Sequence, residues 1–422
     1  MTAAHNTEAR AIEVINRCEK LAHFSQDSGS TRRTFLSPPM RDCHREITCW
    51  LEAAGAEVYI DAAGNLRAFY PGSQPAAPRL ILGSHLDTVP NAGAYDGVLG
   101  VALAVALLEN LNGRKLPIAL EIIGFSEEEG VRFGTPFIGS RALAGTLDDE
   151  LLEVRDREGV SLGQAIRNFG LDPAQIPGAA LNNDTVGYLE FHIEQGPVLE
   201  NLKCPLGAVE TISGQSRLEF KFMGRAGHAG TTPMQLRCDP LAGAAEWITT
   251  VEKVAKIRYG LVATVGNVAV VPGATNVIAG EVSVSLDVRH CSDDIRVRAV
   301  EELSWLAEEI VQRRGLSLIR TVLLSQKAVF LNPFLVDEVE KAMRKAGCVP
   351  QRMVSGAGHD AMIVAEKVPA AMIFLRTSGG ISHQPEETVH VHDVAKAIDC
   401  GIHLLDQLAD STPVRERRQI GG

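Results

Sequence analysis

The feature that most constrains the fold is a series of short apolar runs, each followed directly by polar residues. These runs cover residues 80–83, 118–125 and 186–193, and they are rich in residues that favour β-strands. A helix-like run over residues 98–111 lies between the first two. Buried strands that alternate with helices are typical of a mostly parallel sheet covered on both faces. The sequence therefore predicts an α/β fold.

The character of the chain changes near residue 214. Strand-like patterns cover residues 216–224, 261–271 and 277–290, and helical patterns cover 240–257 and 295–314, without the strand–helix–strand rhythm of the first half. After residue 332 the order helix, short strand, helix returns. We therefore expect one domain from residues 1–212 and 331–422, with a smaller α+β sandwich inserted at 213–330.

Composition and charge exclude several classes of protein. The chain has 41 Lys and Arg against 52 Asp and Glu, which gives a net charge of −11, and no basic run is present, so nucleic-acid binding is not expected. The longest strongly apolar run, residues 97–108, is shorter than the ~20 residues of a membrane helix. No secretory signal precedes the first amphipathic pattern, and the eight cysteines form no CxxC pairs. These observations predict a cytoplasmic protein with reduced thiols and no membrane span.

Polar residues that bind metals follow the predicted strands. His85 and Asp87 come after the first apolar run, and Asp96 stands at the start of the following helix. The other members of this group are Glu127, Glu128, Glu129, His192, Glu194 and Gln195, with His383 late in the chain. Ligands in α/β proteins bind at the carboxyl ends of the strands, and imidazole with carboxylate suits Zn²⁺, Mn²⁺ or Co²⁺.

Each of these residues also has an ordinary structural explanation. His85 and His192 could be buried histidines with satisfied hydrogen bonds, Asp96 could cap its helix, and the three glutamates could form a solvated turn. All of them fall at strand ends, however, and this coincidence favours a metal site. A carboxylate that bridges two ions would allow a binuclear centre.

These residues lie in motifs that resemble one family of enzymes. The motifs are GSHLDTVPNAGAYDG, FSEEEGVRF, IGSRALAG, HIEQGPVLE, GRAGHAGTTPM, GATNVI, LDVRH, SGAGHDAM and GISHQPEE. In this order they closely resemble the binuclear aminoacylase/carboxypeptidase metallohydrolases, and within them the hydantoinase/carbamoylase amidases. The resemblance implies a catalytic domain with two divalent ions per chain, and an inserted domain that forms a homodimer.

The resemblance also implies roles for the metal-binding residues. His85, Asp96 and His192 would hold one ion. Asp96, Glu129 and His383 would hold the other, so that Asp96 bridges the two. A histidine at position 192, where the peptidase branches use a carboxylate, indicates the amidase branch. Asp87 would accept the second ring N–H of His85 and so fix its tautomer.

The remaining catalytic roles depend on the register of the acidic triplet. The family's pair of glutamates directly precedes a glycine, and here Gly130 follows Glu129. Glu128 would then be the general base, and a register shifted by one would make it Glu127. His228 resembles the family histidine that donates a hydrogen bond to the oxyanion from the partner subunit.

Substrate contacts follow from the same resemblance. Arg289 and Asn276 resemble the pair that holds the carboxylate of the substrate. Gln195 and Arg217 match further polar contacts, and Gly358 would offer its backbone. A structural ion pair between Arg289 and Asp287, on the same face of one strand, is the alternative for Arg289.

The sequence thus predicts a metal-dependent amidohydrolase that cleaves a carbamoyl or ureido C–N bond in a small carboxylate-bearing substrate. N-carbamoyl-L-amino acid hydrolysis is the first expectation and allantoate hydrolysis the second. An aminoacylase or dipeptidase is disfavoured by His192. A binding protein on the same fold that lacks catalysis is disfavoured because Glu128 is present.

Overall fold

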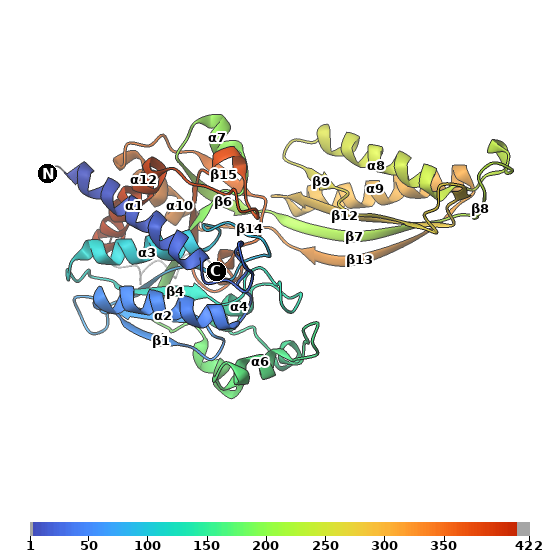
Figure 1. The fold of residues 1–422 in the computed structure, drawn as a ribbon. Coiled ribbons are helices and arrows are strands. Elements are labelled where there is room, and N and C mark those ends of the chain that lie inside the picture. The colour runs from blue at the N-terminus through green and yellow to red at the C-terminus, as the bar shows by residue number, and fades with distance from the viewer. Residues whose placement is uncertain (1–2, 412–422) are drawn as a thin grey trace. The chain divides into compact units, whose positions relative to one another are not determined.

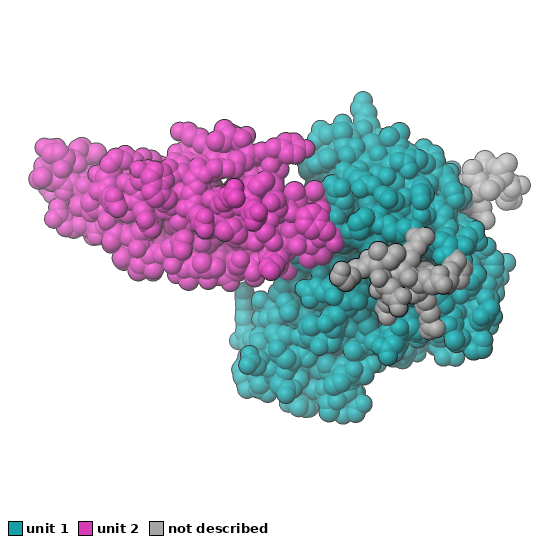
Figure 2. Space-filling model, turned by 180° about the vertical axis from the view of Figure 1, so that it is seen from behind, with its two compact units in different colours: residues 1–210, 331–353, 358–422 teal, residues 211–330, 354–357 magenta. Residues whose placement is uncertain are grey.

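The protein forms two compact units in a computed structural model that describes residues 3–411 (Figure 2). Unit 1 holds the described residues of Met1–Glu210, Leu331–Met353 and Gly358–Gly422, and unit 2 holds Thr211–Phe330 and Val354–Ala357. The division lies close to the predicted borders, but the inclusion of Val354–Ala357 in unit 2 was not predicted. Ser213 donates its backbone N–H to the carbonyl of Ser355 within unit 2, at 2.9 Å. The catalytic and dimerisation roles of the two parts stay predictions.

The core of unit 1 is a mixed sheet with parallel strands at its centre (Figure 1). Strands β4, β3, β5 and β16 run parallel, and antiparallel strands flank them on both sides. In spatial order the strands are β1 (Glu57–Ile60), β2 (Leu66–Tyr70), β4 (Ala119–Phe125), β3 (Arg79–His85), β5 (Thr185–Ile193), β16 (Ala370–Leu375) and β6 (Leu206–Ile212). The α/β fold with a mostly parallel central sheet is therefore confirmed.

Helix α3 (Val98–Leu111) is the most apolar helix packed on this sheet. It contacts strands β3 and β5 and also helices α1 (Ala3–Ala22) and α12 (Val391–Asp410). A helix surrounded in this way is apolar on all sides, which is why its sequence reads as one apolar run. The remaining helices of unit 1 are α2 (Pro38–Ala53), α4 (Ile138–Leu143), α5 (Asp149–Leu152), α6 (Leu162–Asn168), η1 (Pro173–Ala179), α7 (Val198–Leu202), α10 (Pro333–Lys345), α11 (Asp360–Val364) and η3 (Ser378–Gly380).

Unit 2 is a sheet with two helices on one face (Figure 1). Alternate residues of the strands β7 (Gly214–Met223) and β12 (Glu281–His290) are buried on the face that the helices α8 (Pro240–Lys256) and α9 (Asp293–Arg314) cover. Trp247 of α8 lies fully buried against Phe220 and Phe222 of β7. The predicted strand and helical segments of the insertion all form. Its elements are β7 (Gly214–Met223), β8 (Gly227–His228), η2 (Met234–Leu236), α8 (Pro240–Lys256), β9 (Val262–Thr264), β10 (Val268–Val271), β11 (Val277–Ile278), β12 (Glu281–His290), α9 (Asp293–Arg314) and β13 (Ser317–Gln326).

Several elements were not predicted because their sequences show no clear period. These include the short helices between β4 and β5, the strands β6 and β13, and the short strands β14 (Val329–Phe330) and β15 (Arg352–Ser355). None of the helices that the structure describes combines the length and apolar character that crossing a bilayer requires. All eight cysteines lie within the described residues and carry free thiols.

Candidate metal centre

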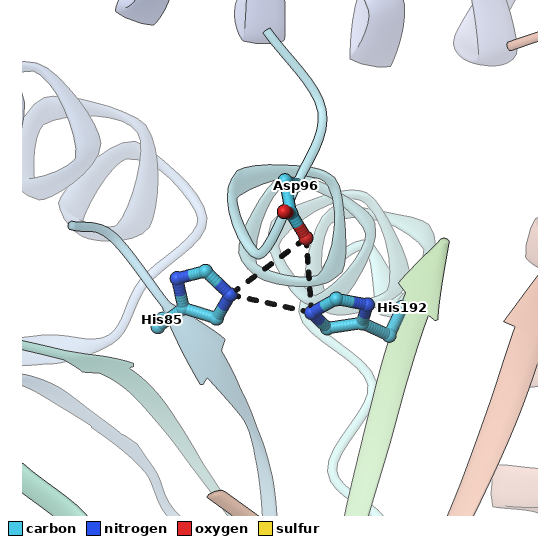
Figure 3. A group of neighbouring side chains, drawn as sticks. All are labelled: His85, Asp96 and His192. Atoms are coloured by element: carbon cyan, nitrogen blue, oxygen red, sulfur yellow. Dashed lines mark hydrogen bonds and ion pairs between the residues drawn. The ribbon is translucent and has the colours of Figure 1, made fainter. Parts of the chain in front are cut away.

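Three buried side chains meet at the carboxyl ends of two neighbouring parallel strands (Figure 3). His85 is the last residue of β3, His192 lies near the end of β5, and Asp96 stands just before α3. The two Nε2 atoms of His85 and His192 are 3.2 Å apart. Oδ1 of Asp96 lies 3.4 Å from Nε2 of His192 and 4.0 Å from Nε2 of His85. Ligand atoms ~2.0–2.2 Å from one tetrahedral ion lie about this far from one another.

In each imidazole ring, the hydrogen bond made by Nδ1 determines whether Nε2 carries a proton or a free lone pair. Nδ1 of His85 lies 3.0 Å from the carbonyl oxygen of Asp87, and Nδ1 of His192 lies 2.9 Å from that of Ile193. Because a carbonyl only accepts, each Nδ1 carries the proton, and in the neutral rings each Nε2 presents a lone pair. When both rings are neutral, two lone pairs and a carboxylate oxygen face one another, an arrangement that a cation satisfies. The donor set fits a divalent metal ion.

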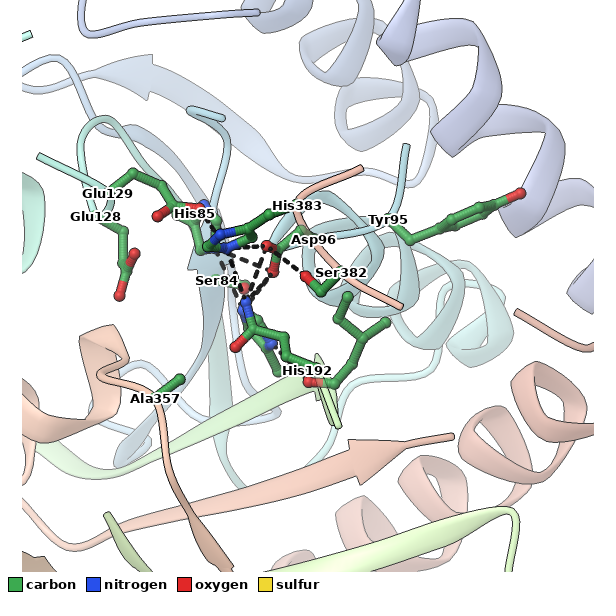
Figure 4. A network of polar contacts seen from close by, with 12 residues as sticks. Ser84, His85, Tyr95, Asp96, Glu128, Glu129, His192, Ala357, Ser382 and His383 are labelled. Carbon is green, nitrogen blue, oxygen red and sulfur yellow. Dashed lines mark hydrogen bonds and ion pairs between the residues drawn. The ribbon is translucent and has the colours of Figure 1, made fainter. Parts of the chain in front are cut away.

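A second group shares Asp96 with the first (Figure 4). Nε2 of His383 lies 3.1 Å from Oδ2 of Asp96 and 3.6 Å from Oε1 of Glu129. Glu129 follows β4, which pairs in parallel with β3, so three adjacent strands contribute to the centre. Since the two oxygens of Asp96 face different groups, one carboxylate is placed where it can serve two ions.

Buried ionisable side chains near the carboxylate of Asp96 have shifted pKa values. Burial, followed by the charge of Asp96, raises the pKa of Glu129 to about 7. Burial also raises the pKa of Glu128 well above its usual value, and Glu129 adds to this effect. Burial lowers the pKa of His192 to about 4, so this ring is neutral at pH 7. For Asp96, burial is outweighed by the hydrogen bond to His383 and by the charges of His192 and His85, and its pKa is lowered.

The carboxylates of the acidic triplet, Glu127 to Glu129, differ in the groups that surround them. Both carboxylate oxygens of Glu127 are taken by backbone N–H groups, of Phe35 at 2.9 Å and of Arg132 at 3.1 Å. The carboxylate of Glu128 makes no hydrogen bond to any residue in the described part of the chain, and it lies within 4.8 Å of the ligand atoms of His85 and Glu129. Of the three, only Glu128 and Glu129 therefore face the metal-binding side chains.

Asp87 was predicted to accept the second ring N–H of His85 through its carboxylate, and this role stays a prediction. Its carboxylate lies 3.6 Å from Nδ1 of His85, and the backbone carbonyl of Asp87 accepts that proton at 3.0 Å. The carboxylate accepts the backbone N–H groups of Glu128 at 2.9 Å and Glu129 at 3.0 Å. A two-residue separation on an extended segment brings the carbonyl as close to the ring as the side chain. Asp87 thus holds the triplet in place.

The comparisons with known proteins agree with this geometry. The sequence matches the model of Peptidase family M20/M25/M40 over residues 81–407. The chain belongs to this family.

Among M20 relatives, the chain is 39% identical to an N-carbamoyl-L-amino acid amidohydrolase of Geobacillus stearothermophilus, over 91% of this chain and 95% of the relative. It is 37% identical to a probable allantoate deiminase of Oryza sativa, over 94% and 88% of the two chains. A solved structure of a hydantoinase/carbamoylase family amidase from Burkholderia multivorans aligns with a TM-score of 0.88 at 29% identity, covering 94% of this chain and 98% of that one. The predicted family is therefore confirmed.

Gln195 was predicted to contact the substrate, and in this chain its side chain is hydrogen-bonded to the carboxylate of Asp96. Its side-chain Nε2 donates to Oδ1 at 3.0 Å and to Oδ2 at 2.9 Å, and it lies 3.3 Å from Nε2 of His383. Gln195 and His383 both have a positive φ, 57° and 59°. Such backbone is strained for residues other than glycine, and such strain clusters at functional sites. The NH₂ group of Gln195 thus contacts the same atoms of Asp96 and His383 that a bound cation would contact.

One buried residue that contacts the segment of Asp96 was not predicted from the sequence. Glu387 is buried, and its Oε1 accepts the backbone N–H groups of Tyr95 at 2.8 Å and Asp96 at 3.0 Å. The hydroxyl of Ser382 lies between Oε2 of Glu387 and Oδ2 of Asp96, at 3.3 and 3.2 Å. Glu387 therefore ties the segment of Asp96 to the loop of His383. The acidic pair that ends GISHQPEE was the only signal in the sequence.

Four of the remaining predicted residues lie in unit 2, where the structure separates them into two groups: His228 with Asn276, and Arg217 with Arg289. His228 and Asn276 lie together, since the carbonyl of Asn276 accepts the N–H of Ala229 and β8 pairs with β11. Arg289 lies near the other end of β12, where that strand pairs with β9. Figure 1 shows β8 and β9 at opposite ends of unit 2. The eight steps of extended chain from Glu281 to Arg289 span roughly 26 Å. The predicted pair of Arg289 and Asn276 is thus not brought together within one chain, because the strand between them is extended.

Arg289 and Arg217 share one partner. Nε and Nη2 of Arg289 lie 2.9 and 3.1 Å from the two oxygens of Asp287, and Nε of Arg217 lies 3.0 Å from Oδ2. Nη1 of Arg289 donates to the carbonyl of Gly356 at 2.6 Å. The ion pair with Asp287, left open as the alternative, is present. A contact with a substrate carboxylate stays a prediction.

Gly358 lies in unit 1 just before α11. A Cβ at this position would lie 2.8 Å from the ring of Phe137, so a side chain there would displace the ring. The structure explains the glycine by this close approach, and the predicted backbone contact with substrate stays a prediction.

Proposed function

We propose that the protein hydrolyses N-carbamoyl-L-amino acids, releasing the amino acid, ammonia and carbon dioxide. The observation that carries this proposal is the pair of donor groups sharing Asp96, with the unbonded carboxylate of Glu128 beside them. The similar Geobacillus enzyme named for this activity supports the choice of substrate. Relatives named allantoate deiminases, at 36–37% identity, make allantoate the second candidate.

The ligands proposed for the two ions are those predicted from the sequence. His85, Asp96 and His192 would hold one ion, and Asp96, Glu129 and His383 the other. Zn²⁺, Mn²⁺ or Co²⁺ bound there would polarise the carbonyl of the substrate and acidify a water molecule. The neutral state of His192 suits this role because only the neutral ring has a lone pair to offer.

Glu128 is proposed as the general base. It is buried, it lies beside the ligands, and its carboxylate is free to take a proton from water and pass it to the departing nitrogen. Glu127 is bonded on both oxygens to backbone N–H groups, which supports the register that places the base at Glu128. Asp87 would act as a positioning residue, since it fixes the backbone of Glu128 and Glu129.

His228 is proposed as the donor to the oxyanion, contributed by a partner subunit. Its Nδ1 accepts the N–H of Gly230 at 3.1 Å, so the proton of the neutral ring is on Nε2, and the residue is exposed. The separation of Asn276 from Arg289 within one chain supports a homodimer, because a substrate held by both would need two chains. Arg289, with Arg217 beside it, would bind the substrate carboxylate in competition with Asp287. We place the dimer in the cytoplasm, in keeping with its free thiols.

Ammonia release tests the proposed activity directly. Protein loaded with Zn²⁺, Mn²⁺ or Co²⁺ is incubated with N-carbamoyl-L-amino acids, allantoate, N-acetyl amino acids and dipeptides, and products are measured. We expect the carbamoyl substrates to turn over fastest, and we expect a chelator to abolish the activity without unfolding the protein. Faster turnover of allantoate would select the second candidate. Turnover of N-acetyl substrates or dipeptides alone would contradict both.

A further inference from the structure

A cavity of about 550 Å³ in unit 1 is lined by four arginines. They are Arg32, Arg41, Arg132 and Arg157, and none of the proposed metal ligands lines this cavity. Its walls come from the segment before α2, the start of α2, Pro90 between β3 and α3, the loop after the acidic triplet, and residues 156–169. A cavity of this size fits a small-molecule ligand.

The most buried polar group in the wall is a hydroxyl with no partner. Ser37 is 4% exposed, and its Oγ forms no hydrogen bond within the described residues. Ser37 is the N-cap of α2, but Pro38 and Pro39 follow it and have no N–H that the hydroxyl could accept. The hydroxyl therefore stays free to donate toward the cavity, at a helix end that favours negative charge.

The other unpaired groups in the wall are mostly donors. Arg157 is exposed and forms no hydrogen bond or ion pair within the described part of the chain, and Nε of Arg32 has no acceptor there. Gln26 uses its Oε1 to accept from Thr34, at 2.8 Å from the hydroxyl, so the amide NH₂ group stays available. Unpaired donors from four residues thus point to a ligand that brings acceptors.

Most acceptors in the wall are already occupied. Oδ2 of Asp156 accepts from Nε of Arg132 at 3.0 Å, and Oδ1 accepts two backbone N–H groups, of Glu158 and Val160. Arg41 donates to the carbonyl of Phe169 at 2.6 Å. The exposed side chain of Glu158 is the one unpaired carboxylate among the lining residues that the structure describes.

We infer that this cavity is a second binding site, for a small anion bearing a carboxylate or a phosphate. Guanidinium groups bind both through parallel N–H···O hydrogen bonds, and Ser37 and Gln26 add neutral donors. None of the proposed metal ligands lines this site, and the inference does not depend on the proposed substrate.

Calorimetric titration of the metal-loaded protein tests the inference. Succinate and inorganic phosphate are the probes, one for each anion type, at constant ionic strength with chloride as the balancing ion. We expect saturable binding of at least one probe, and Arg157→Gln should weaken it by roughly ten-fold or more, since it removes a charge-assisted hydrogen bond. Ser37→Ala should also weaken binding without lowering the melting temperature, because its hydroxyl has no partner to lose.

Two further variants make the result specific to the cavity. Arg45→Gln removes the same charge from an exposed residue of α2 that pairs with Asp42 and does not line the cavity, and it should leave binding unchanged. Asp96→Ala disrupts the proposed metal centre, and it too should retain binding. No saturable binding of either probe, binding that survives Arg157→Gln, or binding lost in Asp96→Ala would each overturn the inference. The last result would place the anion at the metal centre.

Discussion

At the scale of single residues, Glu127 and Glu128 are neighbours with opposite surroundings. We expect Glu128→Gln to lower kcat by ~10²–10⁴, the usual contribution of a positioned proton carrier, while metal content and melting temperature stay unchanged. Glu127→Gln places an NH₂ group against backbone N–H donors, so it should lower the free energy of unfolding by about 1–3 kcal/mol. Steady-state kinetics, metal analysis and thermal unfolding distinguish the two. If Glu127→Gln alone keeps its stability and loses turnover, the register of the triplet is shifted by one.

Glu387 offers a second test at this scale, because it touches the backbone of Asp96. Glu387→Ala should weaken metal binding by roughly 10–100-fold, the usual effect of losing a residue that orients a ligand. Competition with a chromophoric chelator measures this affinity independently of turnover. The exposed neighbour provides the control, and Glu386→Ala should bind metal as the wild type does. Equal affinities in the two variants would exclude a positioning role for Glu387.

At the scale of elements, helix α3 has a glycine at each end with a positive φ. Gly97 has φ 69°, and a Cβ there would lie 2.4 Å from the ring of His85. Gly113, just after the other end, has φ 82°, and a Cβ there would meet nothing within 4 Å. Both substitutions to alanine should cost about 1–2 kcal/mol of stability through the backbone. Only Gly97→Ala should also displace His85, and we expect metal affinity to fall at least ten-fold in that variant alone. Chelator competition and thermal unfolding check this, and unchanged affinity in Gly97→Ala would contradict the contact.

At the scale of the whole molecule, the proposed shared site predicts complementation between subunits. His228→Ala and His85→Ala should each be nearly inactive, the first with normal metal content and the second with reduced metal content. After the two are mixed and subunits exchange, heterodimers should regain one working site, and ammonia release should return in part. A mixture of His228→Ala with Glu128→Gln should behave in the same way. A monomer in sedimentation, or no recovery once exchange is demonstrated by labelled subunits, would contradict the shared site.

The sequence by itself determined the α/β fold, the insertion and the residues at the strand ends. Apolar runs and alternation arise from local geometry, so strands such as β3 and β5 can be located without knowing their neighbours. Parallel strands end at the same edge of a sheet, which is why His85, Asp96 and His192 could be grouped before their distances were known.

Only the tertiary structure decided which partners these residues have. Glu127 is held by Phe35, 92 positions earlier, and Asp96 is tied to Glu387, 291 positions later. No periodic pattern records such contacts, because they depend on how loops pack after the sheet has formed. The same holds for Arg289, whose distance from Asn276 follows from the extended course of β12 rather than from their separation in the sequence. Local patterns therefore place residues on elements, whereas packing between distant segments decides which side chains are free to react.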